Sequence, residues 1–273
     1  MRTFIPCLIF GLLPAAAIAQ TTHPLLVQMQ EKARAVEYGS YRIVAKEHYP
    51  YSSDTILYRA NCSFSRFEHF DGKPGVRYDV EMETQQPNQT IQQRMVFDGF
   101  VKYDLRSDTL LMLYDSRELG DDYVLRGLQH FLFLPLLLHP YQVQRFLGPD
   151  KTLGTPPYET LGDTVIGNTP CRWVGADWAS DTAGIVLQHI RFGLSTATGL
   201  PVYFSHEEET VQEMKNKSNR KRSLEIRVEE WSPALPMNVF YIDWQSLPAS
   251  FEVRHFHDCY NRELLRSRSM PGL

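Results

Sequence analysis

The amino-acid sequence predicts a mainly β protein of the α+β class, in which a strongly curved antiparallel sheet of about eleven strands forms a half-barrel with short helices plugging its concave face. Three observations lead to this fold class. Apolar and polar residues alternate along most of the chain, turn signals separate the alternating runs, and one internal segment changes to a helical period. Alternation with one polar face is typical of antiparallel strands that have water on one side and a core on the other.

The first part of the chain predicts a short helix followed by a meander of strands. The helix covers Leu25 to Val36, where apolar residues recur at helical spacing. The runs that begin at Ile56 and Val76 alternate in polarity, and their charged residues are expected on the outer face. Asp98-Gly99 and Arg106-Ser107-Asp108 are hairpin turn signals, so strands that follow one another in the sequence should pair.

A helical segment is predicted between two groups of strands, from Ser116 to Gln144. Pro135 and Pro140 interrupt its apolar period, so two or three short helices are expected rather than one. The segment carries few charges after Arg126 and has to be covered by other apolar residues. The apolar face of the sheet is its natural partner.

Strands resume after a connection rich in glycine and proline, from Gly148 to Pro157. The stretch FGLSTATGLPVYF predicts a strand, a turn and a further strand, with Gly199 permitting a positive φ. A sheet with this many strands is expected to curl. We therefore predict a single domain over residues 20–258 and a disordered tail over residues 259–273, where the apolar period is lost.

The first 19 residues predict a secretory signal peptide. Arg2 precedes the apolar run Phe4–Leu13, which is too short to span a bilayer, and Ala17-Ile18-Ala19 fits the small-residue rule before a cleavage site. Residues 1–19 should thus be removed on export, and no later run predicts a transmembrane span. The formal net charge of -4 favours neither nucleic acid nor an anionic membrane surface as a partner.

Four short motifs carry a family resemblance. They are Phe97-Asp98-Gly99, Val101-Lys102-Tyr103-Asp104, the hairpin Asp163–Cys171 and the turn Ser195–Pro201. In these motifs the chain resembles the periplasmic lipoprotein-carrier superfamily, the LolA/LolB-like half-barrels, as a divergent exported member over roughly residues 35–247. The resemblance implies a half-barrel fold, a periplasmic location and the carriage of a lipid or lipoprotein acyl chain. No C-x-x-C pair follows the domain, so it implies no thioredoxin-like activity.

A hydrophobic small molecule or lipid is the ligand that this architecture favours, because a sheet curled around helices leaves apolar space between the two layers. Methionine and aromatic side chains suit an adaptable apolar site. The expected cavity-lining residues are Phe64, Tyr78, Met82, Phe97, Leu113, Phe131, Leu134 and Leu137. Core packing without a ligand explains the same apolar residues, so both interpretations stay open.

No catalytic motif occurs in the sequence, so we expect a protein that is not an enzyme and needs no cofactor. A Gly-x-Ser-x-Gly elbow, a phosphate-binding glycine loop and a zinc-protease motif are all missing. His255, His257 and Cys259 would share one face of an extended segment, but no fourth ligand accompanies them and no metal site is expected. The acidic run His206–Thr210 is interpreted as the solvated part of a strand.

Two alternatives stay open at the level of sequence. Cys62, Cys171 and Cys259 follow the signal peptide, and their spacing selects none of the three possible disulfide pairs. The alternative to ligand binding is a non-catalytic interaction module of the cell envelope, which would bind an envelope protein through its charged outer face or a sheet edge.

Overall fold

The structure is a computed structural model, and it describes residues 23–49, 54–68, 74–106, 110–115, 156–180, 185–211, 220–237, 239–243, 247 and 250–255. Three regions predicted from the sequence lie outside these residues: the signal peptide (1–19), the helical segment (116–144) and the tail (259–273). They stay predictions.

The described residues form one helix and twelve strands. Helix α1 (Pro24–Arg34) comes first. The strands are β1 (Tyr38–His48), β2 (Thr55–Glu68), β3 (Pro74–Gln86), β4 (Gln89–Phe97), β5 (Val101–Arg106), β6 (Leu110–Asp115), β7 (Glu159–Ile166), β8 (Thr169–Ser180), β9 (Ile185–Ser195), β10 (Pro201–Val211), β11 (Arg220–Ser232) and β12 (Glu252–His255). Within this part of the chain, no helix has the length and hydrophobicity that crossing a bilayer requires.

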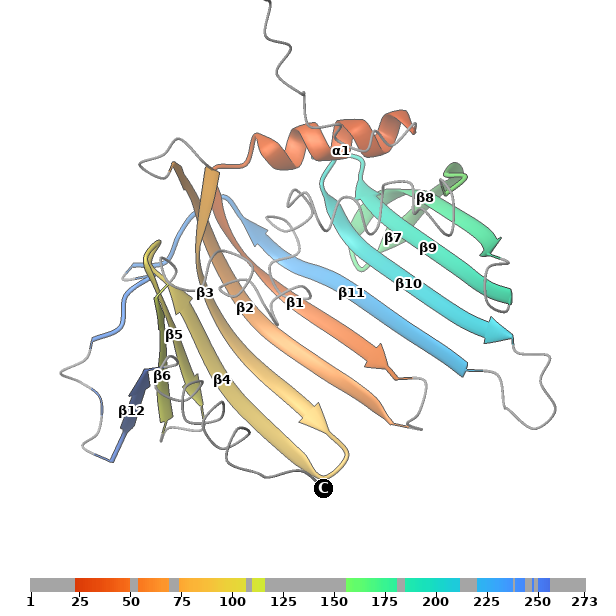
Figure 1. The fold of residues 1–273 in the computed structure, drawn as a ribbon. Coiled ribbons are helices and arrows are strands. Elements are labelled where there is room, and N and C mark those ends of the chain that lie inside the picture. Colours follow the sequence, from red (N-terminus) through yellow and green to blue (C-terminus); the bar gives the residue numbers. More distant parts are fainter. Residues whose placement is uncertain are drawn as a thin grey trace, which may run out of the picture.

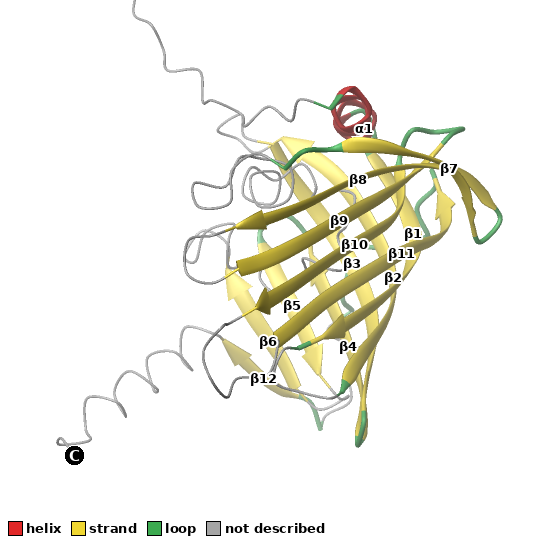
Figure 2. Cartoon of the chain, turned by 90° about the vertical axis from the view of Figure 1, so that its right-hand side faces the viewer, coloured by secondary structure: helices red, strands yellow, loops and turns green. Residues whose placement is uncertain are grey.

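The twelve strands form one sheet in the order β12-β6-β5-β4-β3-β2-β1-β11-β10-β9-β8-β7. Two antiparallel meanders, β1 to β6 and β7 to β11, are joined where β1 pairs antiparallel with β11. The short β12 adds to the edge strand β6 in parallel. The sheet curves into an open half-barrel with β12 and β7 at its edges (Figure 1 and Figure 2). The curved antiparallel sheet predicted from the sequence is confirmed, with twelve strands where about eleven were expected.

Helix α1 crosses one end of the half-barrel (Figure 1). Pro24 lies in its first turn, where a missing N–H costs nothing because that N–H has no partner within a helix. Arg66 of β2 donates hydrogen bonds to the carbonyl oxygens of Ala33 (3.3 Å) and Val36 (2.9 Å), so the end of the helix is fixed to the sheet. The apolar face of the helix is buried in the core through Leu26, Met29 and Ala33.

The concave face of the sheet carries the core. Paired residues of neighbouring strands share a side of the sheet, so alternate residues of each long strand lie on this face. Helix α1 packs on the same face, and both wings of the sheet contribute to one cluster of buried side chains. Its largest fully buried members are Leu26, Met29, Ile43, Phe64, Tyr78, Phe192 and Phe204.

The convex face carries charged residues that pair across strands. Arg94 donates two hydrogen bonds to the buried carboxylate of Asp79 (3.1 and 2.7 Å). Arg59 and Glu83 form a more exposed ion pair at 3.4 Å. Exposed pairs of this kind contribute roughly 0–1 kcal/mol each. The outward position expected for the charged residues of β3 is confirmed.

Part of the convex face is apolar, on the wing formed by β4 to β6. Val96 and Leu111 are fully buried there, although they point away from the concave core. Ile242, which lies between β11 and β12 in the sequence, is buried too. A polar outer face is therefore not a general property of this sheet.

The turn between β9 and β10 has the geometry that its sequence predicts. Gly199 has a φ of +72°, and its N–H donates to the carbonyl oxygen of Ser195 (2.8 Å). The Ser195 hydroxyl oxygen accepts a hydrogen bond from the N–H of Thr198 (3.3 Å). Thr196 donates from its N–H and its hydroxyl to the carbonyl oxygen of Pro170 (3.0 and 3.2 Å). The turn thus connects β9 and β10 to the start of β8.

Replacing Gly199 with valine should lower the free energy of unfolding by about 1–2 kcal/mol, because a β-branched residue is strained at a positive φ. Urea denaturation measures the change. The matched control is Ala197→Val, which adds the same side chain at an exposed position of the same turn and should stay within about 0.5 kcal/mol of the wild type. Equal effects of the two substitutions would contradict this role of the glycine.

Candidate functional site: the concave face of the sheet

The concave face changes from apolar to polar along its strands. From the end near α1, the inward residues of β1 are Tyr41, Ile43, Ala45 and Glu47. On β9 and β10, the cross-strand pairs are Phe192 with Phe204, Ile190 with His206, and Gln188 with Glu208. We call the buried apolar side chains of this face the floor; they include Tyr41, Ile43, Phe64, Tyr78, Met95, Phe97, Ile190, Phe192, Phe204 and Ile226. The charged side chains that surround it form the polar border: Glu47, Glu208, Arg222, Lys102, Asp104 and Arg106.

Glu47 organises the border at the far end of β1. Its buried carboxylate accepts hydrogen bonds from the hydroxyls of Tyr49 (2.8 Å) and Tyr58 (3.4 Å) and from the guanidinium of Arg222 (3.2 Å). Burial raises the pKa of Tyr58, and the nearby Tyr49 and Glu47 act in the same direction, so the hydroxyl stays protonated and able to donate. Three donors make a buried carboxylate tolerable here.

The border continues on β8 to β10. The ring Nε2 of His206 and the side-chain oxygen of Gln188 form a hydrogen bond on the concave face. Trp178 pairs with Gln188, and its buried indole N–H has no acceptor among the residues that the structure describes. Glu207 lies on the other side of β10, where it pairs with Lys221 at 2.8 Å. The acidic run of β10 is therefore divided between the two faces, as its alternation predicts.

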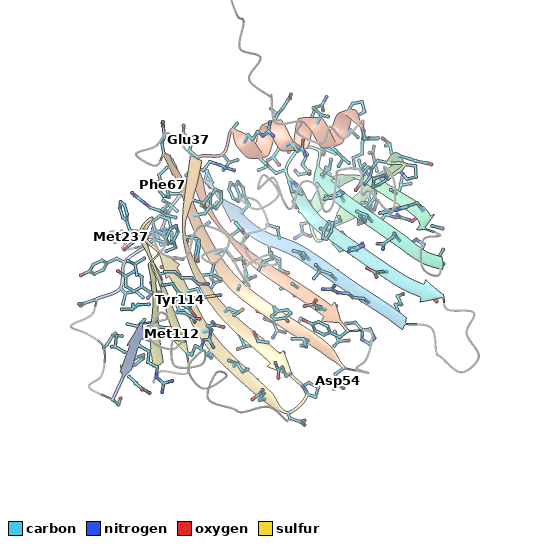
Figure 3. The ribbon with its side chains drawn as sticks, in the orientation of Figure 1. Glu37, Asp54, Phe67, Met112, Tyr114 and Met237 are labelled. Carbon is cyan, nitrogen blue, oxygen red and sulfur yellow. The ribbon has the colours of Figure 1, made fainter. Side chains whose placement is uncertain are left out.

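One cross-strand row of the concave face leads from aromatic residues to a lysine. The register pairs Phe64 with Tyr78, Tyr78 with Phe97, Phe97 with Lys102, and Lys102 with Tyr114. We call these five buried residues the aromatic row. The rings of Tyr78 and Phe97 are 5.7 Å apart, and the Lys102 Nζ lies 5.3 Å from the centroid of the Tyr114 ring, within the range of a cation–π contact. Tyr114 and Met112 project from the same face of β6 (Figure 3).

Lys102 shares the concave face of β5 with Asp104 and Arg106. The buried carboxylate of Asp104 accepts hydrogen bonds from the side-chain amide of Gln93 (2.6 Å) and from two nitrogens of Arg106 (3.1 and 2.8 Å). Burial lowers the pKa of Lys102 to about 8; Asp104 opposes this shift and Arg106 adds to it. The fold thus holds an ammonium group where its charge is disfavoured.

Replacing Lys102 with methionine should stabilise the protein at pH 7, by up to about 3 kcal/mol, because it removes the cost of a buried charge. The folded pKa of Lys102 lies below its ordinary value of 10.5, so the unfolded chain binds more protons between pH 8 and 10.5. The wild type therefore gains stability as the pH rises through this window, and the difference between the two proteins should shrink. Urea denaturation at pH 7 and pH 10 tests this; a difference that does not change with pH would contradict it.

The structure describes five of the eight predicted lining residues. Four lie on the concave face and belong to one buried cluster: Phe64, Tyr78, Met82 and Phe97. The fifth, Leu113, pairs with Tyr103 and so points to the convex side, separated from the other four by the sheet itself. Three lie outside the described residues: Phe131, Leu134 and Leu137. Contact of these side chains with a ligand stays a prediction.

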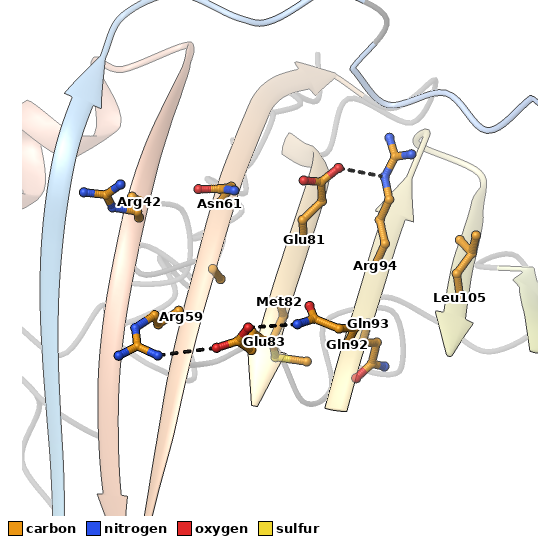
Figure 4. A pocket seen from close by; sticks show the side chains of 11 residues that line it. Arg42, Arg59, Asn61, Glu81, Met82, Glu83, Gln92, Gln93, Arg94 and Leu105 are labelled. Carbon is orange, nitrogen blue, oxygen red and sulfur yellow. Dashed lines mark hydrogen bonds and ion pairs between the residues drawn. The ribbon is translucent and has the colours of Figure 1, made fainter. Parts of the chain in front are cut away.

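A groove of about 540 Å³ lies over β1 to β5 and is lined mainly by convex-face side chains (Figure 4). One cross-strand row across it consists of Arg42, Asn61, Glu81, Arg94 and Leu105. Arg94 and Glu81 pair at 3.8 Å, and Glu83 accepts a hydrogen bond from Gln92 (2.8 Å). The charged side chains of this groove form ion pairs within it or with residues beside it, so it is suited to water and polar groups rather than to an apolar ligand.

Cys62 and Cys171 are buried free thiols. Burial raises the pKa of both, which disfavours the reactive thiolate. Among the residues that the structure describes, no three His, Cys, Asp or Glu side chains are placed to hold a metal ion. His257 and Cys259 lie outside those residues, so the expectation that they bind no metal stays a prediction from the sequence.

Sequence reasoning did not select Glu47 and Lys102, although the signals for both are present. Glu47 continues the phase of Ile43 and Ala45, which places it on the concave face of β1. Phe97 and Lys102 flank the tight turn at Asp98, whose carboxylate accepts the N–H groups of residues 100 and 101 (2.8 and 2.9 Å). The two flanking residues therefore pair, and Lys102 lies on the same face of the sheet as Phe97.

Known protein structures resemble this chain only distantly. No family model matches the chain, and no curated protein sequence matches it significantly. Similar solved structures include LprF from Mycobacterium bovis (8% identity over 80% of this chain and 96% of that chain, TM-score 0.42) and the Mycobacterium tuberculosis lipoprotein LppX (10% identity, 79% and 96%, TM-score 0.41). A LolA superfamily protein from Nitrosomonas europaea is 10% identical over 83% of this chain and 100% of that chain, with a TM-score of 0.29.

Proposed function

We propose that this protein is an exported, periplasmic half-barrel that binds the apolar part of a lipid or of a lipoprotein acyl chain against its concave face, as a carrier. The observation that carries the proposal is the polarity of that face, with its apolar floor under α1 and its charged border. An amphiphilic molecule fits this arrangement, because its tail leaves water on the floor while its polar end meets the border.

The composition of the floor supports the proposal. Apolar burial stabilises a bound tail by about 25 cal/mol per Å² removed from water. Met82 and Met95 lie among aromatic rings on this face, and methionine adapts its shape to irregular apolar partners. The exported location rests on the predicted signal peptide of residues 1–19, and the carrier role rests on the sequence motifs that resemble the lipoprotein carriers.

Native mass spectrometry of the protein purified under mild conditions tests the proposal. We expect a species heavier than the chain, and a lipid should be recovered by solvent extraction of the same sample. The apolar dye N-phenyl-1-naphthylamine should gain fluorescence when it is added to the extracted protein. A mass equal to that of the chain alone, together with no gain in dye fluorescence, would contradict lipid binding.

A second candidate function is an interaction module of the cell envelope, and the edge strand β7 favours it. β7 pairs with β8 on one side and ends the sheet on the other. Leu161 and Val165 of this strand are 48% and 64% exposed. An extended segment of an envelope protein can add to such an edge through backbone hydrogen bonds.

Capture of a partner from envelope extract, with and without detergent, distinguishes this second function from the first. The module predicts a partner that survives removal of lipid and is lost when Leu161 and Val165 are both replaced by lysine, because charged residues on an edge strand oppose strand addition. Capture that the double substitution leaves unchanged would count against this edge as the interface.

A further inference from the structure

We propose that the concave face selects amphiphiles with an acidic head group, a carboxylate or a phosphate ester, which Lys102 and Arg106 of β5 bind while the tail lies along the aromatic row. The inference rests on the proposed function and deepens it by naming the class of ligand. It is carried by the position of Lys102 directly after Phe64, Tyr78 and Phe97 in that row and by the charges on β5.

In the aromatic row, apolar rings that can contact the tail of a ligand are followed directly by a lysine that can bind its head group. Phe64, Tyr78 and Phe97 lie on consecutive strands, and Lys102 lies on the next. Neighbouring strands are roughly 4.8 Å apart, so about 14 Å of aromatic surface separates Phe64 from the lysine. An alkyl chain that follows this surface therefore meets an ammonium group at the end of its apolar contacts.

The charges on the concave face of β5 favour an anion. Lys102 and Arg106 carry two positive charges, and Asp104 carries one negative charge. The carboxylate of Asp104 is already engaged by Gln93 and by both nitrogens of Arg106. The group as a whole keeps one positive charge, and the paired residues on the flanking strands, Phe97 and Tyr114, add no charge near neutral pH.

At the other end of the floor, the side chains that the structure describes are less suited to an anion. There the buried carboxylate of Glu47 and the guanidinium of Arg222 form an ion pair at 3.2 Å, and Glu208 pairs across the strands with Arg222. Among the described side chains at this end, the one guanidinium thus faces two carboxylates. An acidic head group is therefore attracted more strongly to β5, where two cations accompany one carboxylate.

Lys102 costs stability in the empty protein, which a bound oxyanion would offset. Burial lowers the pKa of Lys102, and a shift of this kind on a side chain of the concave face is common at functional sites. An anionic oxygen beside the ammonium favours the charged form and strengthens in a water-poor setting. The same side chain thus destabilises the protein without ligand and gains an anionic oxygen as a further contact when the ligand binds.

Displacement of N-phenyl-1-naphthylamine by two molecules with the same chain tests the inference: oleate, which carries a carboxylate, and oleyl alcohol, which does not. At pH 7 the wild type should bind oleate at least tenfold more tightly than oleyl alcohol. Lys102→Met should lose this preference and still bind oleyl alcohol. The matched control is Lys46→Met, at an exposed position of β1, which should keep the preference of the wild type.

A pH series on the wild type keeps the test independent of how the variants fold. The titratable groups that face Lys102 are Asp104 and Arg106 on β5, Tyr114 on β6 and Tyr78 on β3, whose pKa burial raises well above its ordinary value. The carboxylate of oleate stays ionised above pH 7, whereas Lys102 loses its proton as the pH rises. The preference for oleate should therefore fall between pH 7 and pH 9.5.

The outcomes separate this inference from the proposed function. If the wild type binds oleate and oleyl alcohol equally, or if Lys102→Met keeps the preference, acidic head-group selection is wrong and lipid binding stands. If neither molecule nor the dye binds, the proposed function fails and the inference fails with it. Inorganic phosphate at millimolar concentration should not displace oleate; displacement would show a site for free anions and would overturn the role of the tail.

Discussion

Replacing Phe192 with alanine should lower the free energy of unfolding by about 3–5 kcal/mol. Phe192 is fully buried on the concave face, with its ring centroid 5.1 Å from that of Phe204 and 6.3 Å from that of Tyr158. The smaller side chain removes these contacts and leaves a cavity that close-packed neighbours fill only in part. Urea denaturation of both proteins measures the change.

The matched control is Phe100→Ala, at a position that is 55% exposed in the turn between β4 and β5. It removes the same atoms from the surface, so the free energy of unfolding should stay within about 0.5 kcal/mol of the wild type. Similar effects of the two substitutions would contradict the assignment of Phe192 to the core and of the concave face to the protein interior.

Replacing Leu224 with glutamate should weaken binding of N-phenyl-1-naphthylamine at least about tenfold, which corresponds to 1.4 kcal/mol. Leu224 is partly buried on the concave face of β11, where the register pairs it with Glu47 on one side and with His206 on the other. A second carboxylate at this place extends the polar border into the floor. A bound apolar molecule would then have to cover a charge, which is costly without a partner.

Leu187→Glu is the control for Leu224→Glu, because it makes the same change on the opposite face. Leu187 is partly buried on β9 and pairs with Glu209 on the convex side. Dye binding should stay at the level of the wild type in this variant, and circular dichroism should show the same strand content for both. Equal loss of binding in the two variants would point to a general loss of fold rather than to a site on the concave face.

Residue alternation was sufficient to predict the strands and the face of most core residues. Phe64, Tyr78, Met82 and Phe97 lie together because each is in phase with a strand whose other face is charged or polar. The face of the sheet on which Leu113 lies could not be predicted in the same way. β6 is apolar on both faces, since Leu111 is buried on the convex side, and a shift of one residue in register exchanges the two faces.

Lys102 and Asp104 were not predicted on the concave face, because both are charged. Alternating charged residues normally mark the solvated face of a strand, as Glu81 and Glu83 do on β3, but on β5 they point inward. The convex side of this wing is partly apolar, as the buried Val96 and Leu111 show. The pairing of β1 with β11 is a long-range contact that no local pattern reports.

Quenching of single tryptophans by brominated stearic acid tests most directly whether a tail lies on the concave face. Trp178 projects from the concave face of β8, and Trp173 projects from its convex face, where its ring meets that of Tyr203 at 5.1 Å. Two triple variants keep one of these residues each: Trp173→Phe/Trp231→Phe/Trp244→Phe and Trp178→Phe/Trp231→Phe/Trp244→Phe. Bromine should quench the variant that keeps Trp178 strongly and the variant that keeps Trp173 little. Equal quenching of the two, or quenching of Trp173 alone, would contradict binding on the concave face.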